Sequence, residues 1–249
     1  MSKAVGIIPA RWNSTRFPGK PLHLIDRKPL LKHVWERCLR AKNLDLVVVA
    51  TDDMRVASAA FEWGAEVALT SPRHRTGTNR AAEVARKTRQ FAYVINIQGD
   101  EPLIDPRLID KLVEKLQSNR KVEIVTAAHP FKDPADAFSP HQVKVVLDLR
   151  GNALYFSRAA IPAPRNDGRS LFLRHQGVYG FRRGTLLQFV KWKPSPLERA
   201  ESLEQLRALE NGVTVHVLVT ATGSPGIDTP EDATALEQKL ARANRRMSS

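Results

Sequence analysis

Residues 5–22 read V-G-I-I-P-A-R-W-N-S-T-R-F-P-G-K-P-L, a short apolar run followed by a cationic loop. Its apolar, β-branched beginning, residues 5–8, predicts a strand buried on both faces of a parallel sheet, which Pro9 is expected to end. The loop that follows carries three cations, Arg11, Arg16 and Lys20. Open α/β sheets bind ligands at the carboxyl ends of their strands, so these cations indicate a polyanion, for which a nucleoside triphosphate is the natural candidate.

The loop fits neither of two common phosphate-binding patterns. Only Gly19 precedes Lys20 and a proline follows it, so G-x-x-x-x-G-K-[ST] and G-x-G-x-x-G are both absent. On composition alone, a surface loop whose cations face water is an equal alternative. The spacing P-A-R-x4-R-x-P-G-K-P-L, however, resembles the loop of the sugar nucleotidyltransferases, which join a sugar to a nucleoside triphosphate and release pyrophosphate. This resemblance implies that Arg11 and Lys20 contact phosphate oxygens.

Length and cysteine content limit the class of protein. The 249 residues suffice for one large α/β domain, or for a domain with an inserted lobe. The sequence contains neither a run of about 18 apolar residues nor the features of a signal peptide, which predicts a cytoplasmic protein without a membrane partner. The single cysteine, Cys38, excludes an internal disulfide, and its place on an apolar helical stripe predicts a small buried residue.

The net charge of +13 raises the possibility of nucleic-acid binding, with the basic tail at residues 242–246 as a contact. The cations are nevertheless scattered along the chain, aromatic residues make up only 6%, and no basic run is interleaved with aromatics. We therefore attribute the charge to a solvated surface and to attraction of anionic substrates, and expect no nucleic-acid partner. Nucleic-acid binding is kept as the second class of hypothesis.

Strand and helix patterns alternate through the first half of the chain. We expect strands at residues 5–8, 44–50, 67–69 and 93–97, and helices at 29–41, 54–63, 81–88 and 106–116. The second half predicts short strands at 122–127, 143–147, 153–157, 177–182 and 213–220, a hairpin turn at 148–151 and a helix at 196–211 with surface charge pairs. Together these indicate a single α/β domain over residues 1–249. Its Rossmann-like sheet is mostly parallel, with an antiparallel extension or lobe at about 130–195 for substrate binding or dimerisation.

Two carboxylates stand out at predicted strand ends. Asp100, in Q-G-D-E-P after the strand at 93–97, is well placed to hold Mg²⁺ against phosphates, whereas Glu101 or Asp105 is the better candidate for capping the next helix. Asp228 lies just before a helix start at Thr229-Pro230 and could be only a turn residue. If both face the triphosphate, they form a Mg²⁺ site that lowers the pKa of a sugar hydroxyl for in-line attack on the α-phosphate. Lys20, Asp100 and Asp228 are therefore the candidate catalytic residues.

The segment His74-Arg75-Thr76-Gly77-Thr78-Asn79-Arg80 precedes the helix at 81–88. A Thr-Gly-Thr turn at a helix start can bind a phosphate or a base, or simply cap the helix, and the cap is favoured on chemistry alone. The segment resembles the H-x-S-G-T-[ED]-R element of one cytidylyltransferase family, with Thr76 in place of the serine and Asn79 in place of the acid.

A longer series of motifs carries a more specific resemblance. In chain order these are I-I-P-A-R-x-x-S-T-R-x-P-G-K-P-L, V-A-T-D, G-T-x-R, Q-G-D-E-P, V-K-V-V, A-L-Y-F-S-R-A-x-I-P, R-H-x-G-V-Y-G-F, P-S-P-L-E with E-S-L-E-Q-L-R, and G-I-D-T-P-E-D. From about residue 4 to about residue 235 the chain resembles the 3-deoxy-manno-octulosonate (KDO) cytidylyltransferases. The resemblance implies a Mg²⁺-dependent nucleotidyltransferase that converts CTP and KDO into CMP-KDO and pyrophosphate, acts in lipopolysaccharide biosynthesis and forms a homodimer.

The resemblance also assigns site residues. Arg11, Ser14 and Lys20 match the triphosphate loop, Gln98 a nucleotide contact, and Asp100 and Asp228 the metal ligands. The sugar pocket is matched by His175, Tyr179, Glu204 and Gln205, and Arg158 and Arg174 become candidates for the sugar carboxylate. Without the resemblance, the same residues would be interpreted as a core histidine, a strand tyrosine and the surface of a helix.

Several alternatives stay open. The loop after Ile161 reads P-A-P-R-N-D and departs from the family, so an 8-amino derivative of KDO or a nonulosonate such as sialic acid could replace KDO. The competing class is a non-catalytic, basic RNA-binding relative on the same scaffold.

Overall fold

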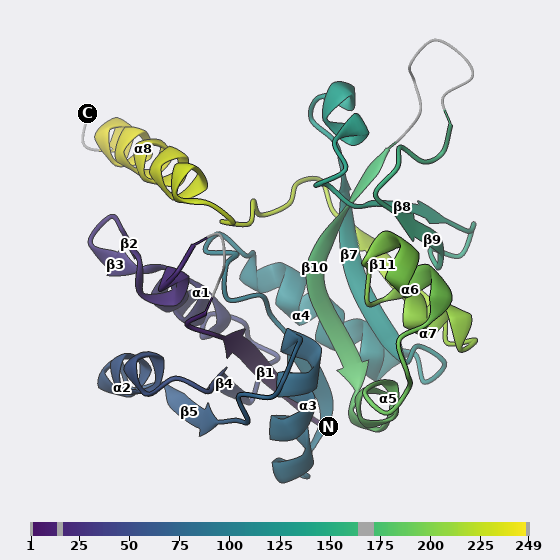
Figure 1. The fold of residues 1–249 in the computed structure, drawn as a ribbon, viewed down its shortest axis with the longest axis horizontal. Helices are drawn as coiled ribbons and strands as arrows, with labels where there is room; N and C mark the ends of the chain where they lie inside the picture. Colours follow the sequence, from purple (N-terminus) through teal and green to yellow (C-terminus); the bar gives the residue numbers. More distant parts are fainter. Residues whose placement is uncertain (1, 14–16, 164–171, 248–249) are drawn as a thin grey trace. The chain divides into compact units, whose positions relative to one another are not determined.

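The computed structural model describes residues 2–13, 17–163 and 172–247, with side chains described up to residue 241. The chain forms two compact units (Figure 1). Unit 1 contains residues 1–3, 90–95 and 111–223, and unit 2 contains residues 4–89, 96–110 and 224–249. Among the described residues, we find no helix with both the length and the apolar character needed to cross a bilayer.

Unit 2 contains a parallel sheet in the order β1-β4-β5. The strands are β1 (Lys3–Ala10), β4 (Leu46–Thr51) and β5 (Glu66–Leu69). Strand β1 pairs with β4 from Val5 opposite Leu46 to Ala10 opposite Thr51. The prediction that Pro9 ends the strand is wrong, because β1 continues through it. Proline lacks a backbone donor but can still adopt the extended conformation.

The helices of unit 2 lie where the apolar periodicity predicts them, except that α3 begins at Gly77, four residues before the predicted start at residue 81. They are α1 (Leu30–Cys38), α2 (Met54–Glu62), α3 (Gly77–Lys87) and α8 (Pro230–Met247), with the short helix η1 (Lys20–Leu22) and the hairpin β2 (Leu24–Ile25) and β3 (Lys28–Pro29). Cys38 is fully buried, as predicted, and burial raises the pKa of its thiol. Asp53 caps α2 by accepting from the Arg55 N–H at 2.9 Å.

Helix α8 is held by an apolar cluster beneath its first turns. The buried members are Phe17, Ile25, Leu30, Ile227, Ala233 and Leu236. Phe17 comes from the cationic segment after β1, and Ile227 lies directly before Asp228. Burial of these side chains fixes the start of α8 against that segment.

Unit 1 contains the antiparallel part of the fold. Its strands are β6 (Phe91–Asn96), β7 (Ile124–Pro130), β8 (Lys144–Leu147), β9 (Ala153–Ser157), β10 (Leu173–Arg182) and β11 (Val215–Val219). They lie in the order β11-β7-β10-β6, with β8 paired to β10 and β9 paired to β8. Strand β10 is antiparallel to β7 and β8, and β11 is parallel to β7 (Figure 1). Its helices are α4 (Pro106–Ser118), which begins in unit 2, with η2 (Pro134–Phe138), α5 (Arg183–Phe189), α6 (Pro196–Glu201) and α7 (Leu206–Glu210). The fold is thus mixed α/β, with a mostly parallel sheet and added antiparallel strands, as predicted.

The single helix predicted at residues 196–211 is wrong. The chain forms α6 and α7, separated by Ser202 in the left-handed conformation at φ 52°. This break lets Arg207 turn back onto Glu198, to which its guanidinium donates two hydrogen bonds. Arg207 is only 5% exposed, so this charge pair is buried rather than superficial. Gly212, at φ 73°, directly follows the C-cap residue Asn211 and ends α7.

Candidate functional site

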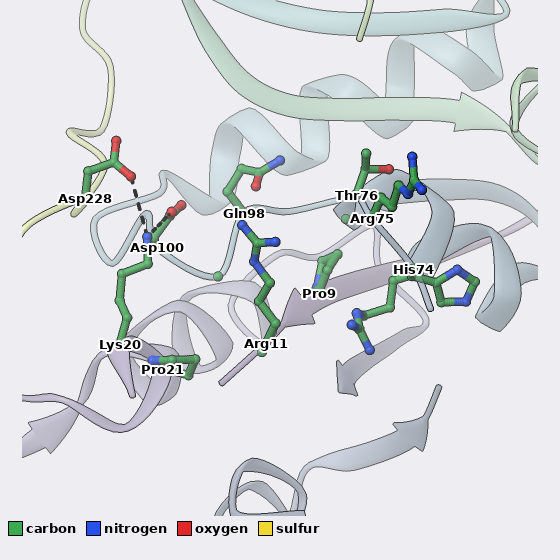
Figure 2. A pocket seen from close by; sticks show the side chains of 14 residues that line it. Pro9, Arg11, Lys20, Pro21, His74, Arg75, Thr76, Gln98, Asp100 and Asp228 are labelled. Carbon is green, nitrogen blue, oxygen red and sulfur yellow. Dashed lines mark hydrogen bonds and ion pairs between the residues drawn. The ribbon is translucent and has the colours of Figure 1, made fainter. Parts of the chain in front are cut away.

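A cavity of about 400 Å³ opens in unit 2, and several separate segments of the chain line it (Figure 2). Its lining comes from the end of β1, from η1, from the start of α3, from the segment after β6 and from the segment before α8. The volume lies within the range of small-molecule sites in proteins, about 300–1,000 Å³. Four cations, Arg11, Lys20, Arg75 and Arg80, line it together with two carboxylates, Asp100 and Asp228.

Lys20 joins the two carboxylates. Its Nζ lies 2.6 Å from Asp100 Oδ2 and 3.6 Å from Asp228 Oδ1 (Figure 2). It also donates to the Ile227 carbonyl at 2.8 Å. The structure therefore brings together the three residues predicted to be catalytic, although 207 positions separate Lys20 from Ile227.

Two backbone features position the carboxylates. The Ile227 N–H donates to the Asp100 carbonyl at 2.9 Å, which ties the two carboxylate-bearing segments to each other. A side chain at Gly99 would place its Cβ 3.0 Å from the Pro9 carbonyl oxygen, so glycine allows the segment after β6 to approach the end of β1.

The predicted nucleotide contacts lie mostly on the cavity wall. Arg11 and Gln98 both line it, and Figure 2 shows the Arg11 side chain directed toward Gln98. Ser14, the remaining predicted contact, lies outside the described residues, as does Arg16.

The segment before α3 caps that helix and also lines the cavity. Thr76 Oγ1 accepts from the Asn79 N–H at 3.2 Å and from Asn79 Nδ2 at 3.0 Å, so Asn79 takes part in the helix cap. Asp105, not Glu101, caps α4 by accepting from the Arg107 N–H at 3.0 Å.

His74 and Glu83 were not predicted to form a pair. His74 Nε2 lies 2.6 Å from Glu83 Oε2, which also accepts from the Ser71 N–H at 2.9 Å. This backbone bond, with added contributions from His74 and Lys87, lowers the pKa of Glu83 to about 2. Glu83 therefore stays ionised and orients His74 at the cavity wall. The resembling motif contains the histidine, but no spacing rule identifies its partner on α3.

The cavity suits an anion accompanied by a divalent cation. The Lys20 ammonium lies close to both carboxylates, so one positive charge can interact with Asp100 and Asp228 at the same time. No group of three or more histidine, cysteine or acidic side chains suited to a metal occurs among the described residues. Mg²⁺ usually takes one or two carboxylates and completes its shell with phosphate oxygens and water, so the donor set fits this ion.

The predicted sugar contacts belong to unit 1. His175 and Tyr179 lie on β10 with ring centroids 5.4 Å apart, and His175 Nε2 is 3.0 Å from Thr126 Oγ1. Burial lowers the pKa of His175 to about 3. Burial, and then the nearby charge of Glu204, raises the pKa of Tyr179.

The structure thus gathers His175, Tyr179 and Glu204 into one neighbourhood. Gln205 precedes α7 as its N-cap residue. Arg158 has a structural role, because its guanidinium donates to the carbonyls of Pro140, Glu201 and Ser202.

Comparison with known proteins gives a consistent family. A family model described as "Cytidylyltransferase" matches residues 5–215. The 3-deoxy-manno-octulosonate cytidylyltransferase of Marinobacter nauticus is 46% identical, covering 96% of this chain and 98% of the relative. That of Geobacter sulfurreducens is 48% identical, covering 94% and 98%.

A solved structure of CMP:2-keto-3-deoxy-manno-octonic acid synthetase complexed with CTP superposes with a TM-score of 0.93 at 40% identity. The match covers 97% of this chain and all of that one. A cytidylyltransferase from Leptospira borgpetersenii, 20% identical with a TM-score of 0.66, shares the fold. On this evidence, the chain belongs to the 3-deoxy-manno-octulosonate cytidylyltransferase family.

Proposed function

We propose that this protein is a nucleotidyltransferase that transfers the cytidylyl group of CTP to KDO and releases pyrophosphate. The observation that carries the proposal is the convergence of Lys20, Asp100 and Asp228 in a cation-lined cavity, in a chain of this family. The product, CMP-KDO, is an activated sugar for lipopolysaccharide synthesis. We also propose that the protein acts in the cytoplasm as a homodimer.

The cations of the cavity bind and orient the triphosphate. Arg11 and Lys20 contact phosphate oxygens, and Gln98 contacts the nucleotide. In the reaction a sugar hydroxyl oxygen forms a bond to the α-phosphorus, while the bond from that phosphorus to the bridging oxygen breaks and pyrophosphate leaves. Lys20 and Arg11 stabilise the negative charge that grows on the leaving group.

Asp100 and Asp228 are the residues that would hold Mg²⁺. When bound, the ion would neutralise phosphate charge and lower the pKa of the attacking hydroxyl. The described part of the cavity offers no nucleophile with an activating base, which favours direct transfer over a covalent enzyme intermediate.

The sugar is proposed to bind through His175, Tyr179, Glu204 and Gln205. An uncharged imidazole, consistent with the lowered pKa of His175, can accept or donate a hydrogen bond to a sugar hydroxyl. Arg174, beside His175 on β10, is the candidate partner for the acidic group of KDO.

A pyrophosphate-release assay tests the proposal. With CTP and Mg²⁺, we expect turnover of KDO that exceeds turnover of 8-amino-KDO and of sialic acid. Asp100→Asn and Asp228→Asn should each lower kcat/KM by about 10²–10³-fold or more, as expected for lost transition-state electrostatics. Asp136→Asn, on the exposed helix η2, is the matched control and should keep its activity.

The assay can also overturn the proposal. If none of the three sugars releases pyrophosphate, or if both aspartate variants keep wild-type turnover, the assigned reaction is wrong. Tight, salt-sensitive RNA binding by an inactive protein would instead support the RNA-binding alternative.

A further inference from the structure

An arginine stacks on a tryptophan in the segment that carries the proposed phosphate-binding cations. The guanidinium carbon of Arg55, at the start of α2, lies 3.7 Å from the ring centroid of Trp12. Asp53 holds this guanidinium from the side, accepting from Arg55 Nε at 2.9 Å and from Nη2 at 2.7 Å. The arginine is therefore fixed in orientation, and its flat face is available to the indole.

The Trp12 ring also contacts the far end of the same segment. A Cβ on Gly19 would lie 3.2 Å from Cζ2 and Cη2 of Trp12, closer than ordinary packing allows. Gly19 adopts φ 71° and ψ 9°, a left-handed conformation that favours glycine. Its N–H donates to the Trp12 carbonyl at 3.2 Å. Residues 12 and 19 are thus joined through both backbone and ring contacts.

The positions of these two residues in the chain give the contacts a functional meaning. Arg11 directly precedes Trp12, Lys20 directly follows Gly19, and both Arg11 and Lys20 line the cavity. The Gly19 carbonyl accepts from the Leu22 N–H at 3.0 Å, which also fixes the short helix that begins at Lys20. Holding Trp12 against Gly19 therefore sets the directions from which both cations enter the cavity.

We propose that Trp12 and Arg55 are positioning residues, which hold Arg11 and Lys20 in the geometry that binds the nucleotide triphosphate. We call Trp12, Gly19, Asp53 and Arg55 the Trp12 clamp. The inference rests on the proposed function, because it takes CTP as the ligand of the cavity. Arg55 does not line the cavity; it acts through Trp12.

If Arg55 only stabilised the fold, Arg55→Ala would lower thermal stability rather than the affinity for CTP. The Arg55 side chain is 59% exposed, so its removal leaves the apolar core intact. Loosening the clamp should weaken phosphate binding while thermal stability stays nearly unchanged, because exposed cation–π contacts contribute little to global stability. An affinity loss of about two- to fivefold corresponds to one exposed cation–π contact.

The chain supplies a matched control for Arg55. Arg107 also follows the aspartate that caps its helix, and it makes the same fork to Asp105, with Nε at 3.2 Å and Nη2 at 3.0 Å from the carboxylate. Among the described residues, ring contacts of arginine were found for Arg55, Arg182 and Arg207 but not for Arg107. Arg107→Ala therefore removes a comparable surface pair without touching Trp12.

The test is isothermal titration of CTP with Mg²⁺ into the full-length protein without sugar, alongside steady-state kinetics. We expect Arg55→Ala to raise the Kd for CTP by about two- to fivefold and to lower kcat/KM for CTP by at least the same factor. Arg55→Lys should recover part of the loss. Trp12→Ala should raise the Kd further, and the double variant should bind no more weakly than Trp12→Ala alone, because Arg55 acts through the ring.

Three results would overturn the inference. They are wild-type CTP affinity in Arg55→Ala, an equal loss in Arg107→Ala, and independent, multiplying losses in the double variant. Failure of the proposed reaction has a separate signature: CTP binds but no sugar is turned over, and the binding comparison then still decides on the clamp. A wild-type protein that binds no CTP would overturn both.

Discussion

Replacing Lys20 with methionine should increase the affinity of the nucleotide-free protein for a divalent cation and weaken its affinity for CTP. In the structure the Lys20 ammonium neutralises both Asp100 and Asp228. A divalent cation that binds these carboxylates must therefore displace the ammonium. Once CTP is bound, Lys20 can contact phosphate oxygens instead, so the same side chain then stabilises the complex with CTP.

The structure sets the size of the effect. An effective dielectric constant of 20 would give about 4 kcal/mol for unit charges 4 Å apart, and exposed ion pairs contribute about 1 kcal/mol or less. Lys20 is 16% exposed and Asp100 29%, so this pair lies between those limits, whereas Asp228 is 57% exposed and adds little. A net contribution of about 1.5 kcal/mol corresponds to roughly tenfold in cation affinity.

Titration with Mn²⁺ followed by electron paramagnetic resonance measures this affinity directly, because free Mn²⁺ gives the detectable signal. Mn²⁺ prefers the same oxygen ligands as Mg²⁺. Without nucleotide, Lys20→Met should bind Mn²⁺ about tenfold more tightly than the wild type. Lys20→Arg keeps the charge and should resemble the wild type, whereas Asp228→Asn in the Lys20→Met background should lose part of the gain.

Wild-type affinity for Mn²⁺ in Lys20→Met would contradict this prediction. So would Mn²⁺ binding by Lys20→Arg that is as tight as binding by Lys20→Met, because the effect would then come from side-chain shape rather than from charge.

Three further predictions concern unit 1. Arg207→Met leaves the Glu198 carboxylate buried without its guanidinium partner. We therefore expect the free energy of unfolding to fall by about 3–5 kcal/mol and the Tm to fall by about 10 °C in thermal denaturation. A change in Tm below about 2 °C would show that the pair is not buried in solution. Gly180→Ala would place a Cβ 2.7 Å from Val125 Cγ1, so urea denaturation should show a free energy of unfolding lower by about 1–3 kcal/mol. Gly184→Ala, whose Cβ would have no neighbour within 4 Å, is the control and should be near neutral. Burial lowers the pKa of His175 to about 3, so below about pH 6.5 the unfolded chain takes up a proton that the folded protein excludes. The free energy of unfolding should therefore fall by about 2 kcal/mol more between about pH 7 and about pH 5 in the wild type than in His175→Gln, and equal losses would show that the imidazole is not held neutral.

Local signals in the sequence predict the fold well. Strand β1 and helix α1 follow from runs and stripes of apolar residues, and the caps at Asp53 and Thr229 follow from short polar side chains before a helix. In each case the residues that decide the structure lie within a few positions of one another. Such local preferences predict the structure correctly because the tertiary packing favours the same conformations.

The failures have a different physical origin. The break at Ser202 is stabilised by the buried contact between Glu198 and Arg207, nine positions apart, which no helical spacing rule detects. The pairing of His74 with Glu83 and the stacking of Arg55 on Trp12 likewise depend on how separate elements meet in space. The residue types were visible in the sequence, but their partners were not.

Asp228 shows how apolar packing creates a polar site. In the sequence it is indistinguishable from a turn aspartate before a capped helix. Its neighbour Ile227 is only 2% exposed and lies in one cluster with Phe17, from the segment that carries Arg11 and Lys20. Burying both apolar side chains places the Ile227 carbonyl 2.8 Å from Lys20 Nζ, and Asp228 follows it to the cavity. A substitution such as Ile227→Ala, which leaves every charged group in place, should therefore weaken the site by releasing Asp228 from Lys20.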